Sequence, residues 1–424
     1  MAEMKPLHVA LLVNHLGFLS GKGGGVERCQ WRLAQEYANR GFRVDVVTLC
    51  GPSSRTAVTP HGIRVVPLDK GGMLLARLTT IRNDPLGILH LLRPLLLIGR
   101  PSGRLRYLAP LKNYLEAENP DLFISAGTYE NLVVLLAHRA SRTRTRVLVS
   151  ERNTLSQVLV HRGHDRSWRW RHLPPLLSRY YAEARKVIAI SRGVADDLRT
   201  VLKLDSNDIN VIYNPVIDQD IAHRARQPVD HPWLTDHAIP VILSVGRFRE
   251  QKDFPTLLKA FALAREQRPL RLVILGDGPE RQVMEQLADE LGISSDVDMP
   301  GFDRNPYGYM ASASLLVLSS RYEGFGNVLV EALACGCQVV STDCPSGPGE
   351  ILERGHFGGL VPVGQPELMA EAVLRALDNP VSKEILRARS RAFTVERAAD
   401  EYLKAAGFDT IDATDPATYQ SATP

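Results

Sequence analysis

Two cationic residues in the second half of the chain have the type and spacing needed to bind a diphosphate. Arg247 and Lys252 lie five residues apart in the segment SVGRFREQKD, directly after an apolar run that predicts a buried strand. Ligands of open α/β sheets bind at the carboxyl ends of the strands, and two cations there are placed to clamp a diphosphate. A pair of solvated surface charges is the alternative interpretation.

A second segment, residues 319–335 (SSRYEGFGNVLVEALAC), places two carboxylates around a glycine-rich turn. Glycines let backbone N–H groups approach an anion, and the N-terminus of the helix predicted next adds a partial positive charge. Glu323 lies in the turn, where its oxygens suit the hydroxyls of a sugar. Glu331 lies on the helix and has a second interpretation as a carboxylate that stabilises the helix dipole. The turn residues with suitable N–H groups are Gly324, Phe325, Gly326 and Asn327.

The elements that must position these residues form two series of alternating strands and helices. In the first, residues 7–13 predict a buried strand, a glycine-rich loop ends near Gly25, and a helix runs from there to Gly41. Each series predicts a doubly wound α/β domain with a parallel sheet. The further predicted strands are residues 43–49, 63–66, 122–125, 146–149, 187–190 and 210–212, and then 240–244, 270–275, 297–299, 314–318 and 338–341.

The same alternation sets the expected domain boundaries. We predict an N-terminal Rossmann-like domain over residues 1–213 and a C-terminal one over residues 240–390. Residues 214–239 are polar and lack periodicity, which predicts an interdomain linker. Residues 391–407 are expected to form a helix that crosses back to the N-terminal domain, and residues 408–424 a polar tail.

Residues 73–115 form an apolar and basic insertion in the first domain. Residues 85–100 (PLGILHLLRPLLLIGR) are apolar but contain His90, Arg93 and Arg100. An apolar face rimmed by arginine is typical of helices that lie in a bilayer interface. An ordinary insertion that packs on the first domain is the alternative. The basic residues that flank the apolar run are Arg77, Arg82, Arg104, Arg106 and Lys112.

Charge and hydropathy limit the expected partners and compartment. Residues 1–214 contain 31 Lys and Arg against 17 Asp and Glu, a net +14, whereas the remaining residues carry a net −10. The basic half suits an anionic membrane surface, and no nucleic-acid-binding module is recognisable. No signal peptide opens the chain, and no apolar stretch reaches the ~18–20 residues that span a bilayer. We expect a cytoplasmic protein, peripheral on the inner face of the cell membrane.

The 5 cysteines argue against a disulfide scaffold or a zinc ribbon, because their number is odd and no C-x-x-C pair is present. Cys335, Cys337 and Cys344 are candidates for a soft-metal site. Packing of small apolar residues is the favoured interpretation of the three.

A family resemblance emerges from the motifs taken together. Glu323 and Glu331 are separated by seven residues, an E-x7-E pattern. With Gly246, Arg247 and Lys252 upstream, GGVE at residues 24–27 and STDCPSGPGEIL at residues 341–352, the chain resembles retaining glycosyltransferase family 4. The resemblance extends over roughly residues 7–405, and is to members that build bacterial polysaccharides and lipid-linked glycans. It implies the GT-B fold, with two facing Rossmann-like domains and an inter-domain cleft.

The resemblance also implies roles for individual residues. The expected reaction is a retaining, metal-independent transfer of a hexose-type sugar from a nucleotide diphosphate donor, expected to be UDP. Arg247 and Lys252 would neutralise the diphosphate, Glu323 would contact the sugar, and Glu331 would hold the ribose. The nucleotide sugar is a co-substrate, so no cofactor and no bound metal are expected. The other implied donor-binding residues are Gly24, Gly25, Gly246, Gly324, Phe325, Gly326 and Asn327.

The acceptor side departs from the family pattern. Many family members have a His after the strand that corresponds to residues 146–149, and this chain has Ser-Glu-Arg-Asn there. Glu151, Arg152 and Asn153 are therefore the acceptor-side candidates. The acceptor itself is expected to be a hydroxyl of a membrane-associated, lipid-linked glycan.

Two other functions fit the same motifs less well. Sugar-nucleotide epimerases share the GT-B fold, and a non-catalytic sugar-binding protein would also suit the basic first half. The E-x7-E pattern combined with Arg247 and Lys252 favours transfer over both alternatives.

Overall fold

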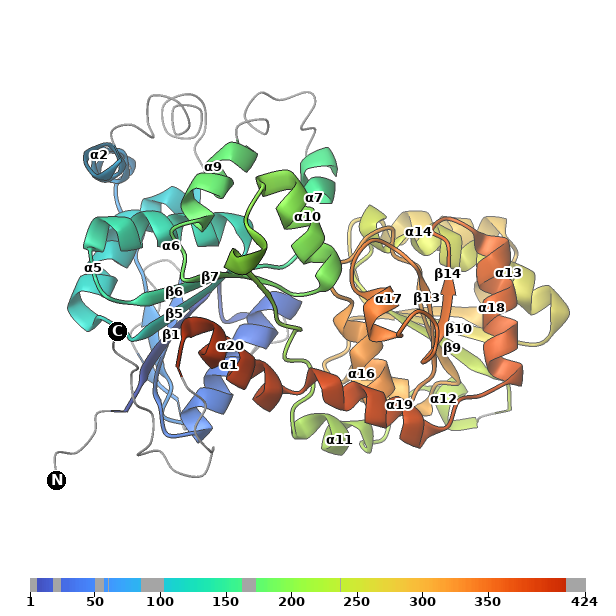
Figure 1. Ribbon diagram of the computed structural model, residues 1–424. Helices are drawn as coiled ribbons and strands as arrows, with labels where there is room; N and C mark the ends of the chain where they lie inside the picture. Colours follow the sequence, from blue (N-terminus) through green and yellow to red (C-terminus); the bar gives the residue numbers. More distant parts are fainter. Residues whose placement is uncertain are drawn as a thin grey trace. The chain divides into compact units, whose positions relative to one another are not determined.

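The structure is a computed structural model that describes residues 6–17, 24–49, 57–59, 61–84, 103–161, 173–236 and 238–408. Contacts divide the chain into two compact units (Figure 1). The first unit comprises Met1–Pro215 and Val395–Pro424, and the second comprises Val216–Thr394. Each unit is built around one β-sheet with its own hydrophobic core.

The first unit contains an eight-stranded sheet. Its strands are β1 (His8–Val13), β2 (Arg43–Thr48), β3 (Ala57–Val58), β4 (Arg64–Pro67), β5 (Leu122–Ala126), β6 (Arg146–Glu151), β7 (Lys186–Ala189) and β8 (Ile209–Val211). The order is β3-β4-β2-β1-β5-β6-β7-β8, and only the edge strand β3 is antiparallel to its neighbour. The chain moves outward from β1 in one direction and from β5 in the other. The carboxyl ends of β1 and β5 therefore flank a topological switch point, where α/β proteins bind ligands.

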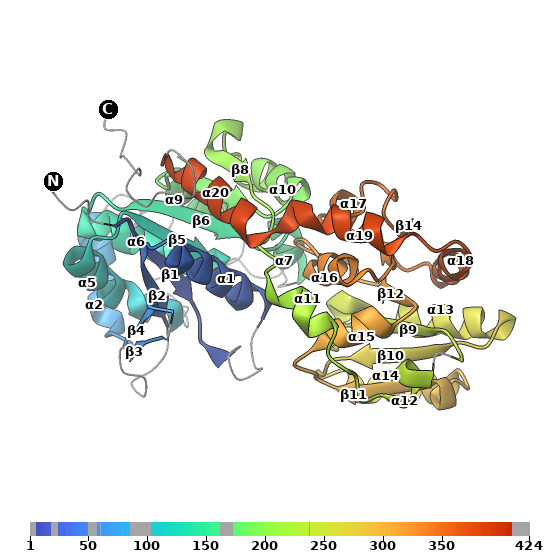
Figure 2. The same cartoon turned by 90° about the horizontal axis from the view of Figure 1, so that it is seen from below.

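Helices cover both faces of this sheet, which is why its central strands β2, β1, β5 and β6 are buried along nearly their whole length. The helices α1 (Gly25–Asn39) and α20 (Val395–Ala406) lie on one face, and α5, α6, α9 and α10 lie on the other (Figures 1 and 2). The remaining helical elements of the unit are α2 (Met73–Asn83), η3 (Gly103–Tyr107), α5 (Leu108–Glu118), α6 (Thr128–Ser141), α7 (Leu155–His161), α9 (Leu173–Tyr181), α10 (Arg192–Leu202) and η4 (Ser206–Asp208).

The last helix of the described chain completes the core of the first unit. Helix α20 packs against α1, and its Leu403 is fully buried. The Tyr37 hydroxyl donates a hydrogen bond to the Ala399 carbonyl oxygen at 3.1 Å. The helix expected over residues 391–407 thus occupies Val395–Ala406, after a 3₁₀ turn, η7 (Arg391–Phe393), that belongs to the second unit.

The second unit contains a six-stranded, fully parallel sheet in the order β11-β10-β9-β12-β13-β14. Its strands are β9 (Val241–Val245), β10 (Arg271–Leu275), β11 (Val297–Gly301), β12 (Leu315–Leu318), β13 (Val339–Thr342) and β14 (Gly359–Val361). Strand order reverses between β9 and β12, so their carboxyl ends form the switch point of this sheet. The loops after these two strands are the ones that carry Arg247, Lys252 and Glu323.

The helices of the second unit also form two layers. Helices α13 and α18 pack on each other, while α16 packs on α15 and α19. The helical elements are α11 (Asp220–Ala225), α12 (Pro232–Asp236), η5 (Glu250–Lys252), α13 (Phe254–Gln267), α14 (Arg281–Glu290), η6 (Ser294–Asp296), α15 (Pro306–Ser312), α16 (Asn327–Cys335), α17 (Pro348–Ile351), α18 (Pro366–Asp378) and α19 (Lys383–Ser390).

The structure differs from the expected linker over residues 214–239. Most of this segment belongs to the second unit and forms α11 and α12, which pack on α15, with α11 also contacting α16. Ile221 and Leu234 anchor the two helices and are each 2% exposed. Helices of six and five residues are too short to show a 3.6-residue hydrophobic period. The sequence pattern of this segment therefore predicted an irregular linker.

Two further differences concern short strands and the insertion. The strands β3 and β14, of two and three residues, carry too little pattern to be predicted. The described parts of residues 73–115 form α2, η3 and most of α5, which contact one another and α6. The apolar run at residues 85–100 lies outside the described residues.

Close backbone contact fixes the loop that carries Arg247. The Gly246 amide donates a hydrogen bond to the Leu275 carbonyl oxygen at 2.9 Å. Gly276 has a φ of +141°, and a Cβ atom at this position would lie 1.8 Å from the Gly246 carbonyl oxygen. Only glycine fits both the dihedral angle and the space, so the loops after β9 and β10 are locked together.

The Gly276→Ala variant should therefore lose at least about 3 kcal/mol of unfolding free energy, because the backbones must separate to admit the methyl group. Gly292→Ala is the matched control, since Gly292 also has a positive φ, of +66°, but has open space around its Cβ position. The control should lose only about 1–2 kcal/mol. Urea denaturation measures both, and equal losses would show that the close contact is unimportant.

Candidate active site

Lys252 and Glu323 meet at the switch point of the second sheet. Lys252 ends η5, and Glu323 lies in the loop after β12. The Lys252 Nζ atom lies 2.6 Å from Glu323 Oε1, which makes an ion pair and a hydrogen bond. Arg247 lies on the same side of the sheet, is exposed, and makes no hydrogen bond or ion pair with any other described residue. The structure thus joins two of the three predicted catalytic residues directly and leaves the third facing solvent.

Three hydrogen bonds hold the two loops of this ion pair against each other. The Ser319 hydroxyl donates to the Lys252 carbonyl oxygen at 2.7 Å, and the Gln251 side-chain amide donates to the Tyr322 carbonyl oxygen at 3.0 Å. The Arg321 amide donates to the Gln251 carbonyl oxygen at 2.8 Å. The loops that carry the two charged groups are therefore held together by hydrogen bonds to their backbone and do not depend on the ion pair alone.

The Glu323 carboxylate is buried, with 8% of the residue exposed. Its Oε1 atom accepts a second hydrogen bond, from the Ser320 hydroxyl at 2.7 Å. A buried carboxylate held by a cation and a hydroxyl keeps one orientation. The side chain is consequently pre-organised to contact a polar ligand at the carboxyl end of β12.

The loop after β13 packs against the glycine-rich turn that contains Phe325. Gly347 has a φ of +94°, and a Cβ atom there would lie 1.8 Å from the Phe325 carbonyl oxygen. The Phe325 ring is 2% exposed and packs edge-on against Phe393, with ring centroids 5.5 Å apart. The side chain of Phe325 thus serves packing, and only its backbone is suited to ligand contact.

Helix α16 begins at Asn327, and Gly326 precedes it with a φ of +99°. No acidic residue lies in the first turn of this helix. Glu331 lies in the second turn, is 5% exposed, and accepts a hydrogen bond from the Tyr307 hydroxyl at 3.4 Å. The field of the helix dipole falls off within the first turn, so this placement does not favour the dipole-stabilising interpretation of Glu331.

Gly24 and Gly25 lie at the switch point of the first unit. Gly24 precedes α1 and Gly25 is its first residue, at the carboxyl-end side of β1. A Cβ atom on Gly24 would lie 2.9 Å from Glu27 Oε2, so the missing side chain leaves room for that carboxylate. The helix N-terminus carries partial positive charge, which suits an anion.

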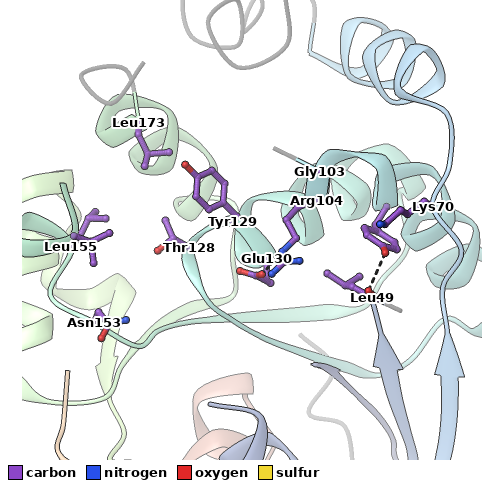
Figure 3. Close-up of a pocket in the computed structure, with 12 residues that line it drawn as sticks. Leu49, Lys70, Gly103, Arg104, Thr128, Tyr129, Glu130, Asn153, Leu155 and Leu173 are labelled. Carbon is purple, nitrogen blue, oxygen red and sulfur yellow. Dashed lines mark hydrogen bonds and ion pairs between the residues drawn. The ribbon is translucent and has the colours of Figure 1, made fainter. Parts of the chain in front are cut away.

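A pocket of about 620 Å³ lies in the first unit at the carboxyl ends of β2, β4, β5 and β6 (Figure 3). Asn153, one of the acceptor-side candidates, lines it. The sequence patterns did not single out Thr128 and Glu130 in the first turn of α6, or Lys70 after β4, all of which also line it. Their positions directly after predicted strands were the available signal.

Glu151 is not among the residues that line the pocket. Only 2% of the residue is exposed. Its carboxyl group accepts hydrogen bonds from the Tyr181 hydroxyl and, at 3.0 Å, from the Thr128 hydroxyl. Burial, with a smaller contribution from the nearby carboxylate of Glu130, raises the pKa of Glu151 to about 7. Glu151 therefore reaches the pocket only through Thr128.

The Arg152 side chain is buried and contacts Asn214. It is 6% exposed, and its Nη1 donates a hydrogen bond to Asn214 Oδ1 at 2.6 Å. Its Nε and Nη2 atoms are buried without a hydrogen-bond partner among the described residues. Of the three acceptor-side candidates, only Asn153 lines the pocket.

The three cysteines considered for a soft-metal site are buried in the second unit. Cys335, Cys337 and Cys344 are unpaired, and burial raises the pKa of each thiol to about 12. Protonated thiols are poor metal ligands. Within the described ranges, no group of three or more His, Cys, Asp and Glu side chains is arranged to hold a metal ion.

Among the helices of the described residues, none is both long enough and apolar enough to cross a membrane.

Comparison with known families assigns both halves of the chain. Residues 23–220 match the model described as Glycosyltransferase Family 4, and residues 230–393 match the model described as Glycosyl transferases group 1. A transferase of Campylobacter jejuni is 32% identical over 278 residues, which are 65% of this chain and 73% of that protein. The chain belongs to glycosyltransferase family 4.

Solved structures give the fold of this family 4 glycosyltransferase. Sucrose-phosphate synthase from Thermosynechococcus elongatus superposes with a TM-score of 0.72 at 22% identity, covering 93% of this chain and 96% of that one. Anabaena HepE in complex with UDP superposes with a TM-score of 0.70 at 19% identity, covering 95% and 100%. Together with the two parallel sheets, these matches show the GT-B fold. The family matches and the Campylobacter jejuni relative do not favour an epimerase or a non-catalytic sugar-binding protein.

The buried carboxyl group of Glu151 should make the stability of the glycosyltransferase depend on pH. Its pKa is about 7 in the folded protein, above the ordinary value of 4.5. Between these two values the folded state retains a proton that the unfolded state has lost, so stability falls as pH rises through this window. Glu151→Gln lacks this titration. From pH 4.5 to pH 8, its unfolding free energy should rise relative to that of the wild type by up to about 3 kcal/mol.

Urea denaturation at several pH values measures this difference. Glu116→Gln is the control, because Glu116 is exposed and pairs with Lys112 across the helix surface. The control should follow the wild-type pH profile. An identical pH profile for Glu151→Gln would contradict a pKa near 7.

Proposed function

We propose that the protein is a retaining glycosyltransferase that transfers a hexose-type sugar from a nucleotide diphosphate donor to a hydroxyl of a lipid-linked glycan. The observation that carries this proposal is the contact of Lys252 Nζ with Glu323 Oε1, 2.6 Å apart at the switch point of the second sheet. A cation and a carboxylate at this place are suited to the two ends of the bond that breaks, the phosphate oxygen and the sugar.

The diphosphate is proposed to bind between the cations and the start of α16. Arg247 is exposed beside the loop of Lys252, and its guanidinium is a strong phosphate ligand. The backbone N–H groups at Gly326 and Asn327 add the partial positive charge of the helix N-terminus. As the bond to the sugar breaks, negative charge grows on the leaving phosphate, and these groups stabilise it.

The carboxylates are proposed to hold the neutral parts of the donor. Glu323 is fixed by Lys252 and Ser320 and would accept hydrogen bonds from hydroxyls of the transferred sugar. Glu331, buried beside the Tyr307 hydroxyl, would accept from the ribose hydroxyls. Neither residue is placed as a nucleophile in this proposal.

Retention of configuration is proposed to result from attack on the face that the phosphate leaves. Departure of the phosphate ahead of attack leaves an oxocarbenium-like sugar, and the acceptor hydroxyl adds on the face from which the phosphate left. The hydroxyl proton passes to the leaving phosphate oxygen, so no protein base is needed at that step. Because Arg247 and Lys252 supply the positive charge, the reaction is proposed to need no metal ion.

Two relatives support the choice of substrates. The Campylobacter jejuni relative is named N-acetylgalactosamine-N,N'-diacetylbacillosaminyl-diphospho-undecaprenol 4-alpha-N-acetylgalactosaminyltransferase, which describes a lipid-linked acceptor. The Anabaena structure holds UDP. We therefore propose UDP as the nucleotide and a glycan on a lipid diphosphate as the acceptor.

Glu323→Gln should lower kcat by at least about 100-fold, because the sugar contact is lost where charge develops, while the Kd for UDP stays within about threefold of wild type. Arg247→Ala should instead weaken UDP binding about tenfold or more. Arg249→Ala is the matched control, because Arg249 is exposed in the same loop. It should behave as wild type.

The assay measures sugar transfer to an extract of lipid-linked glycans in excess EDTA, with calorimetry for UDP. The anomeric configuration of the product is read by NMR. Wild-type turnover in Glu323→Gln, loss of activity in EDTA, or an inverted product would each contradict the proposed mechanism.

Membrane association is proposed to use one face of α2. Leu74, Leu75, Leu78 and Ile81 form a stripe along this helix and are 70%, 53%, 53% and 40% exposed. The spacing places all four on one side, and Arg82 lies exposed at the end of the helix. An exposed apolar stripe with arginine at its edge suits a bilayer interface. This face would keep the enzyme peripheral at the inner side of the cell membrane, where a lipid-linked acceptor is available.

Replacing Leu74 and Leu78 with serine should reduce binding to vesicles of phosphatidylglycerol and phosphatidylcholine at least fivefold, because two large apolar side chains no longer enter the bilayer interface. Val283→Ser with Ile385→Ser is the control, since these residues are 56% and 49% exposed in the second unit. Vesicle flotation measures binding. Wild-type protein that never floats with vesicles, or a control that loses binding equally, would refute the role of α2.

A further inference from the structure

The pocket of the first unit has a cationic end formed by Lys70 and Arg104. Arg104 belongs to η3, and its Nε contacts Glu130 Oε1 at 2.6 Å, which fixes the guanidinium on the pocket wall. Lys70 follows β4 and has no ion-pair partner among the described residues. Glu130 offsets one of the two positive charges, so these three side chains leave a net charge of one cation in the pocket. Figure 3 shows Lys70 and Arg104 at one end and Asn153 and Leu155 at the other.

Reciprocal hydrogen bonds join the two segments that carry these cations. The Gly71 amide donates to the Arg106 carbonyl oxygen at 2.9 Å, and Arg106 Nε donates to the Gly71 carbonyl oxygen at 3.0 Å. Gly71 directly follows Lys70, and Arg106 lies in the same 3₁₀ turn as Arg104. The loop after β4 and the turn η3 are thus a single built wall.

The other end of the pocket presents neutral polar and apolar groups. Thr128 begins α6, and its hydroxyl donates to the buried carboxyl group of Glu151 at 3.0 Å. While this bond is made, the Thr128 oxygen is left to accept, which suits a sugar hydroxyl. The Asn153 amide also faces this end (Figure 3). Leu155 and Leu173 give it an apolar side against which the face of a sugar ring can pack.

The cationic wall is also connected to the exposed apolar face of α2. Helix α2 packs on η3, the element that carries Arg104, within the first unit. A phosphate bound at this wall would therefore lie near the face proposed to enter the bilayer interface. The exposed apolar face of α2 would contribute nothing to binding a free sugar phosphate. A phosphate attached to a membrane lipid would instead lie at the depth of this face.

We infer that this pocket is the acceptor site and that it takes a glycan carried on a lipid diphosphate. Lys70 and Arg104 contact the phosphate groups, and Thr128 and Asn153 contact the sugar that follows. This inference rests on the proposed transfer to a lipid-linked glycan, and it adds which residues recognise the phosphate. Glu151 acts as a positioning residue, because it orients the Thr128 hydroxyl and does not itself reach the ligand.

The test is a binding measurement with farnesyl diphosphate, farnesol and inorganic pyrophosphate, by calorimetry. Saturating UDP is present, so that the donor site does not compete for the diphosphate. The wild type should bind farnesyl diphosphate at least tenfold more tightly than either other probe. Lys70→Gln with Arg104→Gln should lose at least tenfold in this affinity while its Kd for UDP and its melting temperature stay near those of the control. The control, Lys112→Gln with Arg199→Gln, removes two surface cations of the same unit outside the pocket and should bind as wild type.

Three results would overturn the inference. Unchanged affinity in the pocket variant would show that the two cations do not contact the phosphate. Equal losses in the pocket variant and the control would show that only the net charge of the unit matters. Equal binding of farnesyl diphosphate and pyrophosphate would show that the ligand is a free phosphate. Failure of the proposed function is separate, because it appears as absent UDP binding and absent donor turnover in the wild type.

Discussion

The ion pair between Lys252 and Glu323 is the contact around which the second unit is arranged. The two residues are 71 positions apart in sequence, and the parallel sheet brings them together because β9 and β12 are neighbours at the point where strand order reverses. Gly276 and Gly347 let the loops after β10 and β13 lie against the loops that carry Lys252 and Glu323, since a Cβ atom at either glycine would meet a backbone carbonyl oxygen. Backbone packing is therefore what gives the charged groups a fixed separation, and the helix N-terminus at α16 is aligned by the same contacts.

In the first unit, by contrast, the carboxyl group of Glu151 is buried away from the pocket. Glu151 ends the central strand β6 but is buried under the first turn of α6, where Tyr181 and Thr128 replace water as its hydrogen-bond donors. Burial disfavours the charged form, and the hydrogen bonds compensate only in part, which accounts for the raised pKa. The two cations that line the pocket, Lys70 and Arg104, come instead from the loop after β4 and the turn η3. The unit can thus bind a ligand at one end of the pocket without exposing its central carboxylate.

Much of the fold could be predicted from the sequence. Buried parallel strands are short apolar runs, and the helices between them are long enough to show their period, so nearly every strand of both sheets was expected at its observed position. The exceptions have a common cause. The strands β3 and β14 and the helices α11 and α12 are too short for a periodic signal, and their conformation is set by the neighbours on which they pack.

For the site, the sequence by itself determined the residue types and their order: two cations, a glycine-rich turn and two carboxylates, each directly after a strand. Functional groups that depend on local spacing can be recognised in this way from the sequence alone. Tertiary structure alone decided which of these groups touch. It paired Lys252 with Glu323, placed Glu331 beside Tyr307, and turned Arg152 toward Asn214 while Asn153 reached the pocket. Such contacts depend on the direction of each side chain and on strand neighbours far away in sequence, and neither is encoded in the spacing of residues along the chain.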